Sequence, residues 1–255
     1  MSEPLVLVTT VDGVSTVTLN RPQKLNAINT ALAVAIRDAL NDLRDATRVV
    51  ILTGAGDRAF VSGADVREME GLDPAAARRF IETVHEMCWA ALSHPQPVIA
   101  AINGYCLGAG LELAMSCDFR LAADHAQFGM PEIRLGVPSV IEAARMPDLI
   151  GGAWTAELLF TGVTIDVHRA AHIGLVSRVV AREQLHDESL ALARQLSSYS
   201  PVALRLQKQL IRAWRDHDLP KSIQLGVEAL AACYQSGHPN EGMAAFLERR
   251  PARYW

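Results

Sequence analysis

The chain has 255 residues, half of them hydrophobic and a fifth charged, which suits one large globular domain, alone or with a small appendage. Its formal net charge of −4 and pI near 6.1 argue against a protein that binds nucleic acid without sequence preference, because such a protein needs a basic face. No stretch reaches the roughly 18 uninterrupted apolar residues of a membrane span, and the N-terminal residues lack the pattern of a secretory signal. We therefore expect a cytoplasmic protein.

Strands and helices alternate over the first part of the chain. Predicted strands occupy residues 5–22 (a hairpin), 49–56, 97–104, 117–124 and 126–133. Predicted helices occupy residues 29–45, 74–92 and 110–116. Asp12-Gly13 is a strong hairpin-turn signal, and Asn29 or Thr30 is the expected N-cap of the first helix. The alternation implies right-handed crossovers and a mostly parallel sheet.

The pattern changes near Pro138, after which helical spacing predominates. Residues 201–250 read as three helices, divided at residues 219–220 and 237–239. The expected fold class is therefore α/β, with a core followed by a C-terminal helical region.

The cysteines and histidines show no convincing metal-site pattern. The cysteines at positions 88, 106, 117 and 233 are scattered among apolar neighbours without a CxxC pair. His168 and His172, four residues apart on a predicted surface helix, lack further ligands. We expect buried, reduced thiols and no metal.

Three segments combine glycines with carboxylates in a way that favours a site. In the first, residues 53–69, glycines leave backbone N–H groups exposed before a helix that starts with Asp65, and such N–H groups can bind an anion or a developing oxyanion. In the second, residues 100–118, Gly108-Ala109-Gly110 follows a buried strand and precedes Glu112. The alternatives are a surface loop with turn glycines and an acidic residue that merely suits a helix N-terminus.

The third segment, residues 128–136, places Glu132 after a proline among apolar side chains. Apolar surroundings disfavour the charged form of a carboxyl, which can then carry a proton near neutral pH. The alternative is a solvated glutamate at the end of a strand. The phosphate-loop pattern GxxxxGK[ST] and the dinucleotide pattern GxGxxG are both absent.

These segments, in this order and spacing, resemble the enoyl-CoA hydratase/isomerase family of the crotonase superfamily. The resemblance spans nearly the whole chain. The stretches that carry it are LNRPQKLNAIN, LTGAGDRAFVSGADVREM, PVIAAINGYCLGAGLELAMSCD, AQFGMPEIRLG and NEGMAAFLERRPARYW. It implies a spiral of ββα turns over residues 1–195, which carry the acyl-CoA site. It also implies a helical region over residues 196–255 that builds homotrimers, commonly paired into homohexamers.

The resemblance also implies the site residues. Two oxyanion-hole N–H groups fall on Ala64 and Ala109. At position 109 Ala stands where the family more commonly has Gly, and Ala is tolerated there if its φ is negative. The two glutamates of the family's hydratases match Glu112 and Glu132. Positions that match CoA- and substrate-binding residues are Lys24, Ala27, Asp65, Val66, Arg67, Phe246 and Arg249, the last two often contributed by a neighbouring subunit. Of these, Lys24, Arg67 and Arg249 can also be read as ordinary surface cations.

Because both glutamates are present, the resemblance implies an enoyl-CoA hydratase, a lyase that adds water to an enoyl-CoA thioester. CoA is then part of the substrate, and no metal or separate cofactor is required. One alternative is an enoyl-CoA isomerase, or another acyl-CoA enzyme that uses the same enolate. Another is a scaffold that binds CoA or RNA without catalysis, against which the acidic composition weighs.

The chain departs from the family pattern after Gly136. Many members continue with P-G-x-G-G, whereas this chain has VPSVIEAARMP and a third acidic residue, Glu142. Glu142 can recognise a polar acyl tail or assist the chemistry. The simpler interpretation is a solvated glutamate on a helix beside Ala143-Ala144.

Overall fold

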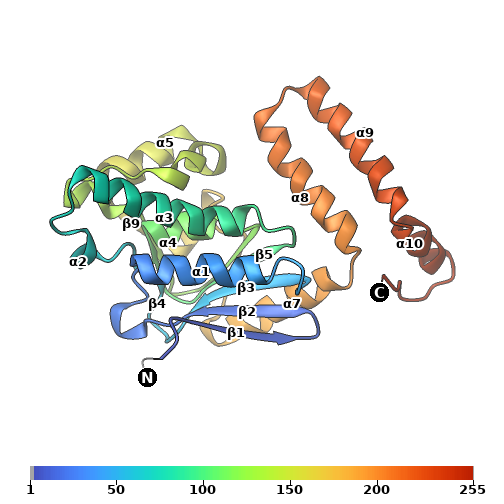
Figure 1. Cartoon of the computed structure of the whole chain (residues 1–255), viewed down its shortest axis with the longest axis horizontal. Coiled ribbons are helices and arrows are strands. Elements are labelled where there is room, and N and C mark those ends of the chain that lie inside the picture. The colour runs from blue at the N-terminus through green and yellow to red at the C-terminus, as the bar shows by residue number, and fades with distance from the viewer. Residues whose placement is uncertain (1–2, 255) are drawn as a thin grey trace.

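The computed structural model describes residues 3–254, which form two β-sheets flanked by helices (Figure 1). The strands of the larger sheet, in chain order, are β1 (Val6–Val11), β2 (Val14–Leu19), β3 (Val49–Gly54), β5 (Val98–Ile102), β7 (Phe119–Ala123) and β10 (Arg178–Val180). Those of the smaller sheet are β4 (Ala59–Val61), β6 (Tyr105–Leu107), β8 (Gln127–Gly129) and β9 (Thr164–Asp166). The predicted α/β fold class is confirmed.

The larger sheet combines one hairpin with parallel strands. β1 and β2 pair antiparallel around Asp12 and Gly13, whose φ values of 51° and 78° lie in the left-handed region of a type I′ turn. From β2 onward the neighbouring strands β3, β5, β7 and β10 are parallel. The predicted hairpin and the mostly parallel sheet are both confirmed.

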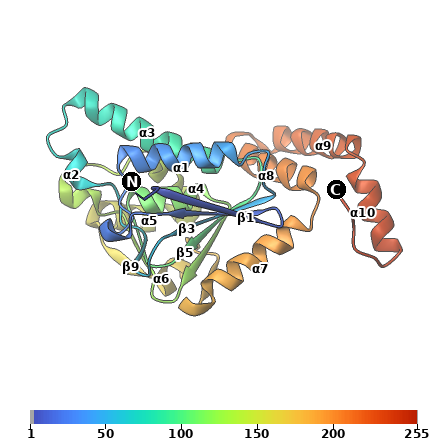
Figure 2. The same cartoon turned by 60° about the horizontal axis from the view of Figure 1, so that its bottom comes forward.

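Helices cover both faces of the larger sheet. The α-helices are α1 (Thr30–Asp42), α2 (Val66–Met69), α3 (Pro74–Leu92), α4 (Ala109–Ser116), α5 (Met146–Thr161), α6 (Val167–His172), α7 (Leu185–Ser197), α8 (Pro201–Asp216), α9 (Leu219–Gln235) and α10 (His238–Leu247). Figure 2 shows α1 and α3 on one side of the sheet and α7 on the other. Val50 and Leu52 of β3 belong to the same buried cluster as residues of α1 and α3, whereas Val49 and Ile51 belong to the cluster that contains residues of α7. β3 is thus buried on both faces, which explains its continuous apolar run.

A repeated connection positions the site. β3, β5 and β7 are each followed by a short strand of the smaller sheet, namely β4, β6 and β8, and then by a helix. The short strands pair in parallel, so their carboxyl ends lie side by side. The three segments singled out in the sequence are therefore brought to one edge of the smaller sheet.

Some element boundaries differ from the prediction. The strand predicted over residues 126–133 ends at Gly129, and Pro131 begins the 3-10 helix η2 (Pro131–Leu135), because proline has no N–H for a strand ladder. β9 and β10 interrupt the region predicted as helical after Pro138. Each has three residues, too few for two-residue alternation to be recognised. At the first helix, Asn29 rather than Thr30 is the N-cap, since its side chain accepts from the Leu32 N–H.

The helices α8, α9 and α10 form a C-terminal arm, residues 201–254, and the breaks between them lie at residues 217–218 and 236–237, within two residues of the predicted positions. α9 packs on α8, α10 packs on α9, and both α9 and α10 lie beside the two sheets rather than on them (Figure 1). The domain boundary predicted at 195/196 falls in the last turn of α7 and stays a prediction. No helix of the described chain is long and apolar enough to span a membrane.

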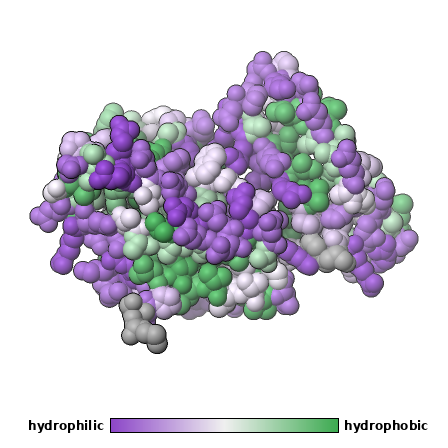
Figure 3. Space-filling view, in the orientation of Figure 1, coloured by the Kyte–Doolittle hydropathy of each residue, from purple (hydrophilic) through white to green (hydrophobic). Residues whose placement is uncertain are grey.

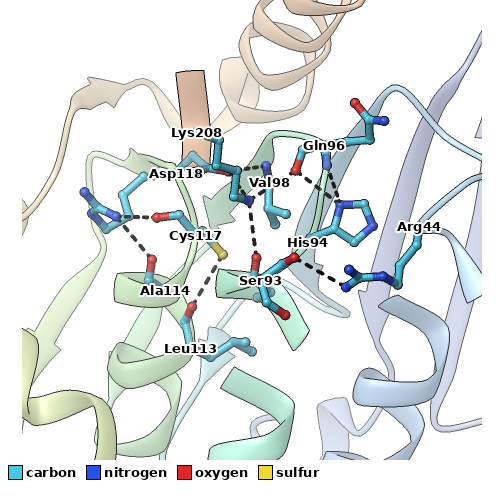
Figure 4. Close-up of polar contacts among 12 residues, drawn as sticks. Arg44, Ser93, His94, Gln96, Val98, Leu113, Ala114, Cys117, Asp118 and Lys208 are labelled. Carbon is cyan, nitrogen blue, oxygen red and sulfur yellow. Dashed lines mark hydrogen bonds and ion pairs between the residues drawn. The ribbon is translucent and has the colours of Figure 1, made fainter. Parts of the chain in front are cut away.

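A buried cation attaches the C-terminal arm to the core (Figure 4). Lys208 Nζ donates to Asp118 Oδ2 at 2.7 Å and to the carbonyl oxygens of Ala91 and Gln96 at 3.4 and 3.2 Å. Asp118 Oδ2 also accepts from the Val98 N–H at 2.8 Å. These contacts join α8 to the end of α3 and the start of β5.

Candidate active site

Two glycine turns touch at the edge of the smaller sheet. Gly63 follows β4 with φ 113°, and Gly108 follows β6 with φ 50°, values that favour glycine. A Cβ atom on Gly108 would lie 3.6 Å from the Cα atom of Gly63. Gly110 permits a further close approach, because a Cβ atom there would lie 2.5 Å from Val61 Cβ. The start of α4 is therefore packed directly against the end of β4.

The N–H group of Ala64 is turned away from the neighbouring segment. Ala64 forms a parallel bridge with Ile28, in which the Ile28 N–H donates to the Gly63 carbonyl at 2.8 Å. The Asp65 N–H donates to the Ile28 carbonyl at 2.7 Å. Because the residues flanking Ala64 make both bonds, its own N–H points to the opposite side.

The N–H group of Ala109 is available for a different reason. Ala109 is the first residue of α4, so this N–H has no acceptor within the helix. Its φ is not among the positive values of the described chain, which is the condition under which Ala was expected to be tolerated. A helix start preceded by a glycine turn favours a negative charge on a bound molecule.

Glu112 is buried in the first turn of α4 and pairs with a different segment. Its side chain is 4% exposed, and Oε1 accepts from the Ala143 N–H at 3.0 Å. Burial, opposed by this hydrogen bond and assisted by the nearby carboxyls of Glu132 and Glu142, raises the pKa of Glu112 to about 9. An acidic residue that merely suited its helix N-terminus would not need to be enclosed in this way.

Glu132 lies in η2, against the turn that leads to Ala109. A Cβ atom on Gly108 would collide with Glu132 Oε1, so glycine makes room for this carboxyl. Oε2 accepts from Ser139 Oγ at 2.9 Å. Burial raises the pKa of Glu132, although the Ser139 hydrogen bond opposes the shift. Glu132 is thus a partly buried residue of a 3-10 helix rather than a solvated strand end.

The two glutamates lie within electrostatic reach of each other beside the glycine turns. Glu112 and Glu132 come from different elements, yet the charge of Glu132 raises the pKa of Glu112. Burial raises both pKa values, so the pair can hold a proton near neutral pH and exchange it with a bound molecule. The N–H groups of Ala64 and Ala109 can stabilise an oxygen that gains negative charge.

The structure contradicts the simpler interpretation of Glu142. This residue is 5% exposed in the 3-10 helix η3 (Ile141–Arg145), not solvated. Its Oε1 lies 2.8 Å from Nδ1 of His85 on α3. The Ala-rich stretch around it resembles an exposed helix, but η3 packs against α3, α4 and α5. Burial raises the pKa of Glu142, and the charge and hydrogen bond of His85 oppose the shift.

Two of the predicted CoA-binding residues lie on the segment that pairs with Ala64. Lys24 is exposed at the end of the 3-10 helix η1 (Pro22–Lys24). Ala27 is half-buried and immediately precedes the bridge to Ala64. Both are therefore near the first glycine turn.

Three more predicted residues follow Ala64 directly. Asp65 caps α2 by accepting from the Arg67 N–H at 3.2 Å, and Val66 and Arg67 are exposed. Arg21 joins the two segments, since it pairs with Asp65 at 3.1 Å and donates to the Ala27 carbonyl. The five N-terminal candidates thus border one side of the candidate site.

Phe246 and Arg249 do not join the others within one chain. Phe246 on α10 is 82% exposed, and Arg249 is exposed just beyond the helix. α10 packs on α9, at a distance from α4 in Figure 1. A role at the CoA end would therefore require a neighbouring subunit.

The sequence did not single out three polar groups of this region. His85 was one of several scattered histidines, and its signal was its place on the same predicted helix as the buried Cys88. Ser139 and Arg21 lie inside the stretches compared with the family but carried no role. Cys88, Cys106 and Cys117 are free and buried as expected, and Cys233 is half-buried. Residues 3–254 contain no group of three or more side chains placed to hold a metal ion.

Comparison with known proteins agrees with this geometry. The family model described as enoyl-CoA hydratase/isomerase matches residues 9–255. A crotonyl-CoA hydratase of Syntrophomonas wolfei is 38% identical over 92% of this chain and 92% of its own. A short-chain-enoyl-CoA hydratase of Clostridium acetobutylicum is 36% identical over 93% and 92%. The crystal structure of an enoyl-CoA hydratase from Bacillus anthracis has a TM-score of 0.95 at 34% identity, over 98% of this chain and 99% of that one. The chain has the crotonase fold and belongs to the enoyl-CoA hydratase/isomerase family.

Proposed function

We propose that this protein is an enoyl-CoA hydratase, which adds water across the α,β double bond of an enoyl-CoA thioester to give a 3-hydroxyacyl-CoA. The observation that carries the proposal is the pair of partly or fully buried carboxyls, Glu112 and Glu132, beside two touching glycine turns. The named relatives described above support it, since both are hydratases of enoyl-CoA substrates.

The thioester carbonyl oxygen binds between the N–H groups of Ala64 and Ala109. Negative charge grows on this oxygen when the water oxygen attacks Cβ, and one such donor typically contributes about 3–4 kcal/mol to the transition state. The N-terminus of α4 adds its dipole at the same place. The carbonyl is therefore polarised by backbone groups alone.

Glu112 and Glu132 hold the water and move its proton. The water O–H bond breaks, its oxygen bonds to Cβ, and a proton is delivered to Cα. Because both carboxyls have raised pKa values and the charge of Glu132 raises the pKa of Glu112, the proton is shared by the pair rather than assigned to one member. Glu132, which lies against the Gly108 turn, is the member that we place next to Cα.

The C-terminal arm supports assembly into a homotrimer or homohexamer. Five large apolar side chains lie exposed along α9 at helical spacing, namely Leu219, Ile223, Val227, Leu230 and Tyr234. Met243, Phe246 and Leu247 of α10 are exposed as well. In Figure 3, apolar surface interrupts the polar surface of the arm. A neighbouring subunit would cover these side chains and bring Phe246 and Arg249 to the adenine-nucleotide end of CoA.

The proposal is tested by following the loss of enoyl-thioester absorbance with crotonyl-CoA and with longer and branched enoyl-CoAs. The matched control is the Glu112→Ala, Glu132→Ala double variant. We expect turnover by the native protein alone. Binding of CoA thioesters without hydration of any of them would reject the hydratase assignment and keep the site.

A further inference from the structure

A carboxyl oxygen next to Glu112 is buried without a partner. Glu142 immediately precedes Ala143, whose N–H donates to Glu112 Oε1. The backbone that carries Glu142 therefore also holds Glu112. The charge of Glu142 raises the pKa of Glu112, so the two carboxyls lie within electrostatic reach. Glu142 Oε2 has no hydrogen-bond partner in the described chain.

His85 holds the other oxygen of this carboxyl. Its Nδ1 lies 2.8 Å from Glu142 Oε1, and its side chain is half exposed. The His85 ring therefore hydrogen-bonds Oε1 of the carboxyl from the α3 side, and Oε2 is the oxygen without a partner. The other titratable groups around Glu142 are Glu112, Arg145 and Cys88, whose buried thiol hydrogen-bonds the Glu142 carboxyl. Oε2 itself has no hydrogen-bond partner among the described residues.

The backbone around Glu142 is also unusual. Ile141 has φ 42°, a left-handed value that a β-branched residue rarely adopts. A strained backbone and an unsatisfied buried oxygen are both destabilising, and such features concentrate at functional sites. A polar group that arrives with the reactants would satisfy Oε2.

We propose that Glu142 Oε2 hydrogen-bonds a hydroxyl group bound beside Glu112, supplied either by the reacting water or by the acyl chain of the substrate. This rests on the proposed function and extends it with a third carboxyl at the site. A hydroxyl group both donates and accepts, so it matches Oε2 in either protonation state of Glu142. His85 is the positioning residue for this carboxyl.

The test combines binding with turnover in the full-length protein. Calorimetry gives the affinities for butyryl-CoA and 4-hydroxybutyryl-CoA, two saturated thioesters that cannot be hydrated, and crotonyl-CoA gives kcat and KM. The variants are Glu142→Leu, which removes the hydrogen bond, and Glu142→Gln, which keeps part of it. Glu86→Gln is the matched control, because Glu86 is exposed on α3 next to His85 and pairs with Arg37.

Two results support the proposal and identify the source of the hydroxyl. If the acyl chain supplies it, the native protein prefers the hydroxylated thioester about tenfold, Glu142→Leu loses the preference and Glu142→Gln regains part of it. If the water supplies it, both thioesters bind alike. In that case kcat with crotonyl-CoA falls about tenfold in Glu142→Leu at unchanged KM, and Glu142→Gln restores part of it.

The proposal is overturned if Glu142→Leu, with a native circular-dichroism melt, keeps both the affinity ratio and kcat within about twofold of the native values. Should this variant not fold, the same comparison is decided with Glu142→Gln. A native protein that binds thioesters but hydrates none contradicts the proposed function instead. In that case the ratio of the affinities for 4-hydroxybutyryl-CoA and butyryl-CoA alone decides whether Glu142 binds a hydroxyl group.

Discussion

The candidate active site and the C-terminal arm distribute polarity in opposite ways. At the site, the acidic side chains of Glu112 and Glu142 are enclosed among apolar residues, and their partners are a backbone N–H and a histidine. On the arm, apolar side chains such as Leu219 and Phe246 are more than 70% exposed. Each arrangement is unfavourable in an isolated chain, because a buried carboxyl loses hydration and exposed apolar surface gains contact with water.

The difference shows what each region needs to be complete. The candidate site combines carboxyls and backbone N–H groups within one chain, so a small molecule that supplies a carbonyl and a hydroxyl would complete it. The arm contains no buried core of its own comparable with that of the sheets, and protein surface from another copy would complete it. Catalysis and assembly should therefore be separable by mutation.

The largest effect is expected from Glu132→Gln, which removes the proposed proton carrier and keeps the shape of the side chain. We expect kcat with an enoyl-CoA to fall about thousandfold, in the range of general acid–base catalysis, while thioester binding and assembly stay nearly intact. Absorbance assays of enoyl-thioester loss measure kcat, and calorimetry measures thioester binding. Glu157→Gln, an exposed residue of α5, is the control. Unchanged turnover in Glu132→Gln would remove Glu132 from the mechanism.

A second prediction concerns the exposed face of α9. Val227→Glu combined with Leu230→Glu should shift the protein from an oligomer to a monomer, because a subunit interface would have to bury both new charges. Light scattering coupled to size-exclusion chromatography measures the mass, and circular dichroism checks the fold. Glu228→Gln, on the same helix, should leave the oligomer unchanged. An oligomer that survives the double substitution would place the interface elsewhere.

Most of the fold was predictable because its elements are long or carry strong local signals. The helix at residues 74–92 begins at a proline and ends before a serine, and its predicted and observed limits coincide. The Asp12-Gly13 turn and the three helices of the arm were equally clear. Of the three-residue strands in the smaller sheet, β4, β6 and β9 were not predicted, because their pairing depends on contacts distant in sequence.

The site was predictable only in part, and the reason is again distance along the chain. Gly108 and Glu132 each carry a local signal, but their contact follows from the pairing of β6 with β8. The burial of Glu142 depends on η3 packing against α3, so a stretch that resembles an exposed helix gave the wrong environment. His85 had no local feature that distinguished it from the other histidines.

A third prediction tests how the arm is attached. Lys208→Met should lower the free energy of unfolding by about 2 kcal/mol, less than for a fully buried pair because Asp118 keeps some exposure. Urea denaturation measures this change. Lys221→Met, an exposed lysine of α9, should change stability by less than about 0.5 kcal/mol. Equal stability of Lys208→Met and the native protein would mean that the packing of α8, not the ion pair, holds the arm.

The smallest expected effect, when it is taken for a single unit of pH, is a pH dependence of stability caused by Glu112. Its pKa is 4.5 as a free side chain and about 9 in the folded protein, so between these values the folded state keeps a proton that the unfolded state has lost. The stability that Glu112 contributes is therefore fully present below pH 4.5 and is lost as the pH rises towards 9.

Glu112→Gln cannot ionise, and its amide oxygen can still accept from the Ala143 N–H. As the pH rises through neutrality, this variant should gain about 1 kcal/mol of stability relative to the native protein for each unit of pH. The gain should be smaller where Glu132 and Glu142 titrate together with Glu112. Thermal melts from pH 5 to pH 9 measure the difference. Parallel curves would mean that Glu112 is ionised in the folded protein. It would then act as a base from the start of the reaction, and the proton delivered to Cα would have to come from Glu132.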